Sequence, residues 1–409
     1  MDVPQDTAAL LDEIDAFIER EIVPLEREGD NARFFDHRRE IARTDFDNGG
    51  IPSREWEDLL HEAQRRSDQA GLLRLALPEE LGGRAASNLT MAIVREHLNR
   101  RGIGLANDPQ SEVSIVGNFP TVLLVHEFGT EEQRAQLVEP AITGEKGLAF
   151  GLTEPDHGSD ATYLETTARR DGGDWVINGT KRFNSGMHRA SHDLVFARTS
   201  GEPGQPLGIT GFIVPRDAEG LDVPFHWWTF NLPTDHAEVT LENVRVPDGA
   251  ILGEVDRGLE LAQRFVHENR IRQAASSLGS AAFCIDEAVR FARERTTWNK
   301  PLWKNQGIQF PLAELWTDCE LVRGLVRSTA KALDERHHME VTHLVAMANY
   351  RANRLACEAA DRAMQTCGGM GYTRHMPFEH IYRHHRRYRI TEGSDEIQLR
   401  KVAQALFAR

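Results

Sequence analysis

The sequence is poor in cysteine, with 4 among its 409 residues and no C-x-x-C pair. The cysteines are widely spaced, at Cys284, Cys319, Cys357 and Cys367. Disulfide frameworks and cysteine metal sites need closer or paired spacing, so neither kind of site is expected here. This cysteine usage suits the reducing environment of the cytoplasm.

Long apolar runs are also missing, because none approaches the roughly 20 residues that a membrane-spanning helix needs. The first residues, Met1-Asp2-Val3-Pro4-Gln5-Asp6, lack the basic and apolar parts of a signal peptide. We therefore predict a soluble, cytoplasmic protein with no membrane partner.

Positive charge is scarce, since 63 acidic side chains outnumber 48 lysines and arginines and leave a net charge of −15. General nucleic-acid binding is therefore excluded, because no overall positive field exists to displace counterions. An anionic ligand would need a local basic cluster. The 40% of hydrophobic and 27% of charged residues are typical of a globular protein, and 409 residues allow two or three domains.

The spacing of apolar residues divides the chain into three segments. Residues 1–146 show mostly helical spacing, with an irregular inserted connection around residues 28–54. Residues 147–250 contain short β-prone runs separated by turn signals. Residues 251–409 are helical again, with Leu321 and Val326 on one apolar face. We predict an α+β fold, in which an N-terminal helical domain, a central β-barrel or sandwich domain and a C-terminal four-helix bundle follow one another.

Short local signals predict turns and helix ends. Asn178-Gly179 is typical of a tight hairpin turn. Thr130 is a candidate N-cap, and Ser394 is another for the last helix. Glu392 would then lie in the loop ahead of that helix, where its carboxylate could point into a cavity. Compensation of the helix dipole is the simpler interpretation of the same residue.

Two strings in the β segment could carry chemistry. Thr153 and Ser159 lie in a loop after the first predicted strand, with hydroxyls suited to a heteroaromatic ring or a thioester carbonyl. An ordinary capped loop is the alternative. Phe183 and Ser185 could flank a flat cofactor, or they could form a routine strand edge.

Two strings in the C-terminal segment suggest phosphate binding. Gly368, Gly369 and Gly371 follow a long helix, where glycines let a backbone approach phosphates closely or simply end the helix. They do not form a G-x-G-x-x-G motif after a strand, so a Rossmann fold is not predicted. Arg295 could bind a pyrophosphate through its planar guanidinium group, or it could be a solvated arginine at a helix end.

Taken together, these strings resemble the acyl-CoA dehydrogenase family over nearly the full length of the chain and in the same order. The α–β–α order is also that family's domain plan. The matching strings are Pro78-Glu79-x-x-Gly82-Gly83, Phe128-Gly129-Thr130, Thr153-Glu154-Pro155-x-x-Gly158-Ser159-Asp160, Arg295-x-x-Trp298 with Gln306, Gln365-x-x-Gly368-Gly369-x-Gly371, and Glu392-Gly393-Ser394.

The resemblance implies FAD as cofactor, bound between the central domain and the C-terminal bundle. The residues that it assigns to FAD are Thr153, Ser159, Phe183, Ser185, Arg295, Trp298, Gln306, Gln365, Gly369, Ser394 and Glu396. Among these, Arg295, Gln306, Gln365 and Gly369 would reach the FAD of a neighbouring subunit. The resemblance therefore also implies a homotetramer, or at least a homodimer.

The implied reaction is the α,β-dehydrogenation of an acyl-CoA, as in fatty acid β-oxidation. Glu392 would remove the α-proton as catalytic base, while the β-hydrogen leaves as a hydride to flavin N5. The backbone N–H of Glu392 would stabilise the thioester oxygen. Ser159, Arg270 and Gly393 would contact the acyl-CoA, and electrons would pass to electron-transfer flavoprotein.

Some family members carry the base on an earlier helix, where this chain has Asn269. Asparagine cannot act as a base, and the adjacent Glu268 would point about 100° away round a helix. Both observations favour Glu392 as the base.

The chain departs from the family pattern on the acyl-CoA side. Asp156-His157 replaces a small pair, His267 replaces a frequent acidic residue, and His384 replaces a typical aspartate within the basic run 383–389. That run could meet CoA phosphates or electron-transfer flavoprotein, or it could be a solvated helix face. The length, branching or ring character of the acyl group stays open.

Two other functions compete with a dehydrogenase. An acyl-CoA oxidase or a flavin monooxygenase would use oxygen on the same fold. A non-catalytic partner subunit would contribute FAD contacts to a mixed tetramer. Glu392 and Arg270 at the dehydrogenase positions favour the dehydrogenase over both.

Overall fold

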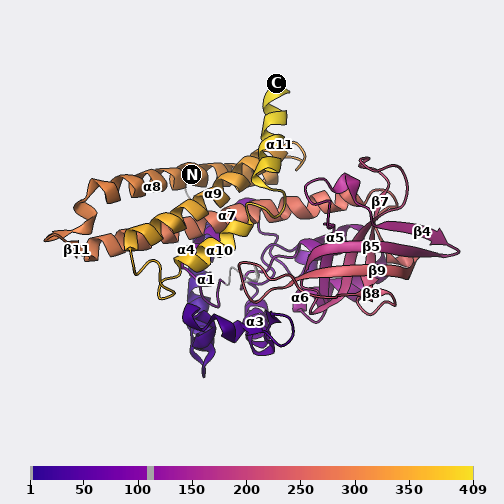
Figure 1. Cartoon of the computed structure of the whole chain (residues 1–409), viewed down its shortest axis with the longest axis horizontal. Helices are drawn as coiled ribbons and strands as arrows, with labels where there is room; N and C mark the ends of the chain where they lie inside the picture. The colour runs from indigo at the N-terminus through magenta and orange to yellow at the C-terminus, as the bar shows by residue number, and fades with distance from the viewer. Residues whose placement is uncertain (1–2, 108–114, 409) are drawn as a thin grey trace. The chain divides into compact units, whose positions relative to one another are not determined.

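The computed structural model describes residues 3–107 and 115–408, which form two compact units. The first unit comprises Met1–Ala42, Asp58–Asn118 and His267–Arg409, and the second comprises Arg43–Glu57 and Phe119–Val266. Along the chain, helices come before and after a block of strands (Figure 1). The predicted α+β class and its order of helical, strand and helical segments are confirmed.

The N-terminal helical segment contains a structured connection where the sequence predicted an irregular one. The helices of this segment are α1 (Gln5–Phe17), α2 (Val23–Arg27), α3 (Arg54–Gln69), α4 (Asn88–Arg100), α5 (Pro120–Phe128) and α6 (Glu131–Thr143). A π-helical turn at Ile18–Ile22 joins α1 to α2. Between α2 and α3 lie 3-10 helices at Asn31–Phe35 and His37–Arg43 and a ribbon of β1 (Thr44–Asp45) and β2 (Ile51–Pro52).

Helix α6 begins as the sequence predicts. The Thr130 hydroxyl accepts a hydrogen bond from Gln133 N at 3.2 Å, and Gln133 Oε1 accepts one from Thr130 N at 3.0 Å. This reciprocal capping box satisfies two backbone donors that a helix start leaves open. Gln133 Nε2 also donates to the carbonyls of Gly249 and Ile251, each at 2.9 Å, so the cap ties α6 to the end of the sheet.

The second unit is built on an eight-stranded sheet in the order β10-β7-β6-β4-β5-β9-β8, with β3 pairing parallel to β6. Its strands are β3 (Gly147–Gly151), β4 (Thr167–Asp171), β5 (Asp174–Ser185), β6 (Ala190–Arg198), β7 (Ile209–Pro215), β8 (Leu221–Asp222), β9 (His236–Pro247) and β10 (Ile251–Leu252). The central strands β6 and β7 are buried along most of their length. Their buried apolar residues include Leu194, Val195 and Phe196 on β6 and Phe212, Ile213 and Val214 on β7.

The prediction of a hairpin at Asn178-Gly179 is wrong. Strand β5 continues through these residues without a turn. Its register against β9 shifts between Ile177 and Gly179, which makes a bulge. The hairpin lies earlier, where Gly172 and Gly173 connect β4 to β5. Glycine is needed at position 179 because a Cβ there would come within 2.7 Å of Thr166 Cα.

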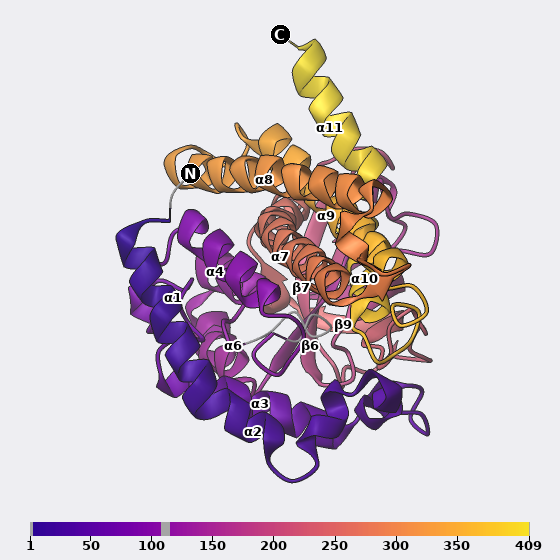
Figure 2. The same ribbon diagram turned by 90° about the vertical axis from the view of Figure 1, so that its left-hand side faces the viewer.

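The C-terminal segment consists of long helices. They are α7 (Gly258–Glu294), α8 (Gln306–Glu335), α9 (Thr342–Cys367), α10 (Phe378–Arg387) and α11 (Asp395–Phe407). Helix α9 packs against α8, α10 and α11, and α8 also contacts α4. Figures 1 and 2 show that α11 projects from the other helices of its unit. No helix within residues 3–107 and 115–408 is long and apolar enough to cross a membrane.

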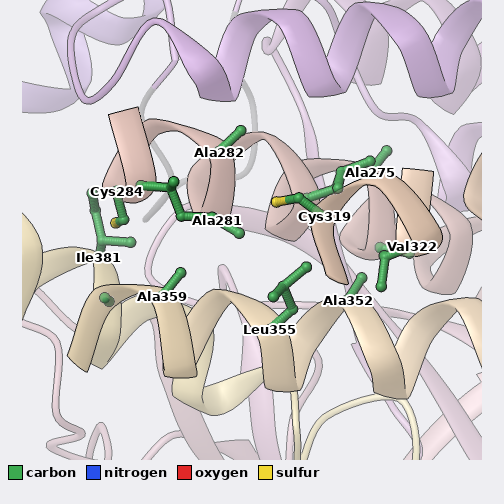
Figure 3. Close-up of a cluster of buried hydrophobic side chains, with 14 of the residues drawn as sticks. Ala275, Ala281, Ala282, Cys284, Cys319, Val322, Ala352, Leu355, Ala359 and Ile381 are labelled. Carbon is green, nitrogen blue, oxygen red and sulfur yellow. The ribbon is translucent and has the colours of Figure 1, made fainter. Parts of the chain in front are cut away.

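Small side chains let these helices approach closely. Figure 3 shows Ala352, Leu355 and Ala359 of α9 pointing toward residues of α7 and α8 in a buried cluster. A close spacing between helix axes requires small contact residues, which alanine and cysteine supply. On α8 the packed residues include Val326, whereas Leu321, which the sequence placed on the same face, is 66% exposed.

The basic run 383–389 is not a solvated helix face. His384 and His385 lie on α10 and are almost fully buried. His385 contacts the hydroxyls of Ser277 and Ser280 on α7 through its two ring nitrogens, at 3.0 and 2.8 Å. Burial, with the charge of Arg387 second, holds the pKa of His384 well below its usual value. These histidines are therefore part of the packing between α10 and α7.

Candidate active site

The loop between α10 and α11 carries Glu392 in an unusual backbone conformation. Glu392 has φ +57° and Gly393 has φ +94°, so two successive residues lie in the left-handed region. For a residue with a side chain this conformation costs on the order of 1 kcal/mol and persists only where surrounding contacts hold it. The loop thus turns the chain sharply into α11 and leaves the Glu392 side chain outside any helix.

Arg270 of α7 holds the main chain of this loop. Its Nε and Nη2 atoms donate to the Glu392 carbonyl at 2.9 and 2.6 Å, and Gln398 Nε2 donates to the same oxygen at 3.1 Å. A Cβ at Gly393 would lie 3.1 Å from Arg270 Nη2, so glycine allows the guanidinium to approach. Burial lowers the pKa of Arg270 to about 10, and Glu392 opposes that change, so the arginine stays charged at neutral pH. The predicted base and the predicted substrate residues Arg270 and Gly393 therefore lie together.

The Glu392 carboxylate contacts Asn269, the residue that occupies the alternative position of the base. Asn269 Nδ2 lies 3.4 Å from Glu392 Oε1. Asn269 Oδ1 accepts hydrogen bonds from Asn118 Nδ2 at 3.2 Å and from Arg272 Nη2 at 3.1 Å. No pattern in the sequence indicates this contact, apart from the identity of Asn269 itself. The side chain of Glu268 lies outside those that the structure describes.

Ser394 directly precedes α11, as predicted, and Glu396 lies in the first turn of that helix. Ser394 occupies the N-cap position, and within the described chain its side chain makes no hydrogen bond to a backbone N–H of that helix. The Glu396 carboxylate accepts hydrogen bonds from the backbone N–H of Glu396 and from the Ser394 hydroxyl. These hydrogen bonds hold the pKa of Glu396 below its usual value. Asp395 is buried and accepts hydrogen bonds from Arg354 Nε at 2.9 Å and Arg389 Nε at 3.0 Å. The ion pairs of Asp395 fix the first turn of α11 to α9.

The predicted residues Arg295, Trp298 and Gln306 lie where α7 connects to α8. A ribbon of β11 (Thr296–Thr297) and β12 (Lys300–Pro301) joins these helices. Trp298 and Asn299 form its turn with φ +46° and +62°, the pair of positive values that a type I′ turn needs. The Trp298 side chain is 90% exposed, and Gln306 is the exposed first residue of α8.

The predicted residues Gln365 and Gly369 lie at the end of α9, and both are exposed. Gly368 has φ +59°, and a Cβ built at Gly368 or Gly369 would meet no atom within 4 Å. The backbone of this turn is therefore open to a large group such as a phosphate, in agreement with one of the two interpretations of these glycines.

In the second unit, a buried ion pair that the sequence did not single out fixes the loop after β3. Glu154 Oε1 accepts hydrogen bonds from Lys181 Nζ at 2.7 Å and Thr166 N at 2.9 Å, and its Oε2 accepts one from Glu165 N at 2.5 Å. Burial raises the pKa of Glu154, but Lys181 and these donors outweigh it, so the net change is downward. The carbonyl of Thr153 accepts from Arg182 N at 2.8 Å, which holds this loop against β5.

Phe183 and Ser185 lie side by side on an exposed stretch of β5. The register against β9 shifts between Arg182 and Asn184, so Phe183 is the extra residue of a bulge, with φ +64°. Its ring lies 5.8 Å from that of Trp227. The Ser185 hydroxyl is 2.8 Å from His236 Nδ1 on β9. The bulge thus turns an aromatic ring outward beside a hydroxyl.

Ser159 lies further along the loop after Thr153 and is exposed. Asp160 caps the 3-10 turn Ala161–Tyr163, since its Oδ1 accepts from Thr162 N at 3.1 Å. His157, one of the departures from the family pattern, lies 3.4 Å from Glu165 Oε1 and stacks on Tyr163 at 6.2 Å between ring centroids. This departure therefore has local partners within the loop.

A buried polar pair lies on β5 and β6 next to the Phe183 bulge. Asn184 Nδ2 donates to Asp193 Oδ2 at 2.6 Å, and both side chains are fully buried. Burial raises the pKa of Asp193 to about 7. The stability contributed by the protonated carboxyl is complete below pH 4, the usual range of this pKa, and is lost as the pH rises through about 7.

Asp193→Asn should remove this pH dependence, because the amide stays neutral at every pH. Relative to the wild type, the stability of the variant at pH 8 should exceed its stability at pH 5 by roughly 2–3 kcal/mol, because about two pKa units of the shift are lost over this range. Urea unfolding between pH 5 and pH 9 measures the difference. Asp222→Asn, at an exposed position on β8, is the control and should change neither value. Parallel pH curves for wild type and Asp193→Asn would contradict the prediction.

The exposed groups in each unit suit a flat cofactor that carries phosphates. One unit presents the Phe183 ring and the Ser185 hydroxyl. The other presents the open glycine backbone at Gly368 and Gly369 and the exposed Arg295. An aromatic face, a hydroxyl, an open glycine backbone and an arginine are each suited to bind a part of FAD, its ring or its phosphates.

Models of three successive domains of one family match the chain. The N-terminal domain of acyl-CoA dehydrogenases matches residues 52–145, the middle domain residues 149–244 and the C-terminal domain residues 256–407. A 3-(aryl)acrylate reductase from Clostridium sporogenes is 35% identical over 355 residues, covering 84% of this chain and 90% of the reductase. The mitochondrial short-chain specific acyl-CoA dehydrogenase of Bos taurus is 35% identical over 340 residues, covering 83% of this chain and 81% of that enzyme. The solved structure of butyryl-CoA dehydrogenase from Megasphaera elsdenii matches with a TM-score of 0.82 and 26% identity, covering 100% of this chain and 99% of that one.

Proposed function

The chain belongs to the acyl-CoA dehydrogenase family of FAD-dependent flavoproteins, and we propose that it catalyses the α,β-dehydrogenation of an acyl-CoA thioester with Glu392 as the base. The observation that carries the proposal is the geometry of the Glu392 loop. The residue stands outside any helix, and its carbonyl is held by Arg270 and Gln398. A base must be held in position against a C–H bond, and a fixed main chain supplies that.

In this proposal Glu392 accepts the α-proton of the bound thioester. A thioester α-proton is weakly acidic, so the negative charge that develops on the carbonyl oxygen must be stabilised. The backbone N–H of Glu392 is the proposed donor to that oxygen. The charged Arg270 binds the Glu392 carbonyl, so it holds the following peptide, between Glu392 and Gly393, and limits rotation of the main chain at Glu392. When bound, FAD supplies the acceptor for the hydride from the β-carbon.

The remaining contacts are proposed residue by residue from the family pattern. Ser159, Arg270 and Gly393 would contact the acyl-CoA. The contacts to FAD would come from Thr153, Ser159, Phe183, Ser185, Arg295, Trp298, Gln306, Gln365, Gly369, Ser394 and Glu396. Arg295, Gln306, Gln365 and Gly369 would serve a second copy of the chain, so we propose a homotetramer or homodimer that donates electrons to electron-transfer flavoprotein. A cytoplasmic place in fatty acid β-oxidation fits the same proposal.

Anaerobic titration of the purified, FAD-loaded protein with a panel of acyl-CoA thioesters tests the reaction. We expect at least one straight-chain, branched or aromatic acyl-CoA to bleach the flavin absorbance with about one equivalent per site, because two electrons pass to each FAD. The panel also identifies the acyl group. Failure of every acyl-CoA to bleach the flavin would contradict the proposal and favour a non-catalytic subunit.

The electron acceptor is tested after reduction. Electron-transfer flavoprotein should restore the yellow colour faster than air-saturated buffer does. Rapid reoxidation by air with formation of hydrogen peroxide would instead favour an acyl-CoA oxidase.

A further inference from the structure

We infer that Asn269 is a positioning residue that donates a hydrogen bond to the carboxylate of the base, Glu392. The inference rests on the proposed function, because it assigns a second residue to the same catalytic step. The sequence alone excluded Asn269 as a base and assigned it no role.

The neighbours of Asn269 fix the orientation of its amide group. The side chain lies on α7 and is 3% exposed. Two donors, Asn118 Nδ2 and Arg272 Nη2, point at its Oδ1 from 3.2 and 3.1 Å. An amide turned the other way would set its NH₂ group against both of these donors. The network therefore fixes Nδ2 as the group that faces Glu392 Oε1, at 3.4 Å.

The neighbouring residues Asn269 and Arg270 contact different parts of Glu392. Arg270 binds the carbonyl of Glu392, while Asn269 contacts its carboxylate. The main chain of Glu392 is thus held by contacts that do not involve its side chain. The contact of Asn269 with Oε1 adds a restraint on that side chain, because a glutamate can sample several staggered rotamers.

The contact with Asn269 also bears on the charge of the Glu392 carboxylate. A hydrogen bond donated to a carboxylate favours its ionised form, which is the form that accepts a proton. Charged groups that the structure describes on the surrounding elements of this unit include Arg270 and Arg272 on α7, Arg354 on α9, Arg389 after α10, and Asp395 and Lys401 on α11. Asp395 forms ion pairs with both Arg354 and Arg389. Asn269 adds a neutral donor at the carboxylate itself, without a further net charge.

The test uses the FAD-loaded enzyme and the acyl-CoA that bleaches it best. In Asn269→Ala the acid limb of the kcat/KM profile should move to higher pH by about one unit, because the carboxylate loses one hydrogen bond. On the alkaline plateau kcat should fall about tenfold through looser positioning, with KM within about twofold of the wild-type value. Asn269→Asp keeps the size of the side chain but replaces the donor by a second carboxylate, so its acid limb should move further in the same direction.

Two further variants separate positioning from a merely structural role. Asn118→Ala removes one of the two donors that orient Asn269, so it should shift the acid limb less, and its effect should vanish in the Asn269→Ala background. Asn99 is the matched control, because its amide is also buried in this unit and donates to the Arg95 carbonyl at 2.9 Å. Asn99→Ala should lower the melting temperature and leave the acid limb in place.

The inference would be overturned by a folded Asn269→Ala or Asn269→Asp enzyme with the acid limb and plateau of the wild type. Equal shifts in Asn99→Ala and Asn269→Ala would overturn it as well. Crystal structures give a readout that does not depend on turnover: the Glu392 carboxylate should occupy one position in the wild type and more than one in Asn269→Ala. An unchanged carboxylate would refute positioning by Asn269. By contrast, a wild-type flavin that no acyl-CoA can bleach refutes the proposed reaction, so the two failures are distinguishable.

Discussion

Glu392→Gln should reduce the rate at which an acyl-CoA bleaches the flavin by about 10²–10⁴-fold, the range that a general base contributes. Glutamine keeps the size of the side chain and an oxygen that can accept from Asn269, but it cannot take up a proton. FAD content and melting temperature should stay at the wild-type values, because the main chain of this loop is held by Arg270 and Gln398. Stopped-flow reduction under anaerobic conditions measures the rate.

The control for this variant is Glu358→Gln, at an exposed position of α9. It makes the same chemical change within the same unit and should leave the reduction rate within about twofold. A Glu392→Gln enzyme that retains FAD and near-normal reduction would remove Glu392 from the role of base. The next candidate would then have to be sought among other carboxylates, since Asn269 cannot replace it.

Lys181→Met should destabilise the second unit by about 3–5 kcal/mol, because it leaves the carboxylate of Glu154 buried without its cation. Both partners are almost fully buried, and their charged atoms lie 2.7 Å apart. The same change should loosen the loop that carries Thr153 and Ser159, so FAD should dissociate more readily. Urea unfolding, and the FAD retained after gel filtration, measure the two effects.

Two comparisons sharpen this prediction. Lys181→Met combined with Glu154→Gln removes both charges and should recover a large part of the lost stability, because no unpaired buried charge remains. Lys331→Met breaks an exposed pair with Glu335 on α8 and should change stability by less than about 1 kcal/mol. Equal effects of Lys181→Met and Lys331→Met would show that the buried pair does not hold the loop.

Local signals were sufficient where the structure depends on near neighbours in the chain. Thr130 caps α6 through Gln133, three residues away, and the last helix begins at Asp395, directly after the predicted cap Ser394. The succession of helical, strand and helical segments follows from apolar periodicity in the same way. Each of these features depends on contacts within a few residues, which composition and spacing encode directly.

Local signals failed where distant pairing competed with them. Asn178-Gly179 favours a tight turn, yet β5 extends through it because the pairing with β9 continues on both sides. The charged run 383–389 suggested a solvated face, yet His384 and His385 are buried in the packing of α10. In both cases the tertiary contacts outweigh a local preference of about 1 kcal/mol or less.

By itself, the sequence determined the class of the fold, the family and the candidate base, Glu392. Only the tertiary structure decided what surrounds that base: Arg270 and Gln398 on its carbonyl, and Asn269, 123 residues away in the chain, on its carboxylate. It likewise revealed the pairs Lys181–Glu154 and Asn184–Asp193 beneath the exposed stretch of β5. The physical reason is that hydrogen bonds between distant residues form only after backbone packing has fixed the positions of both partners, and no local pattern in the chain encodes those positions.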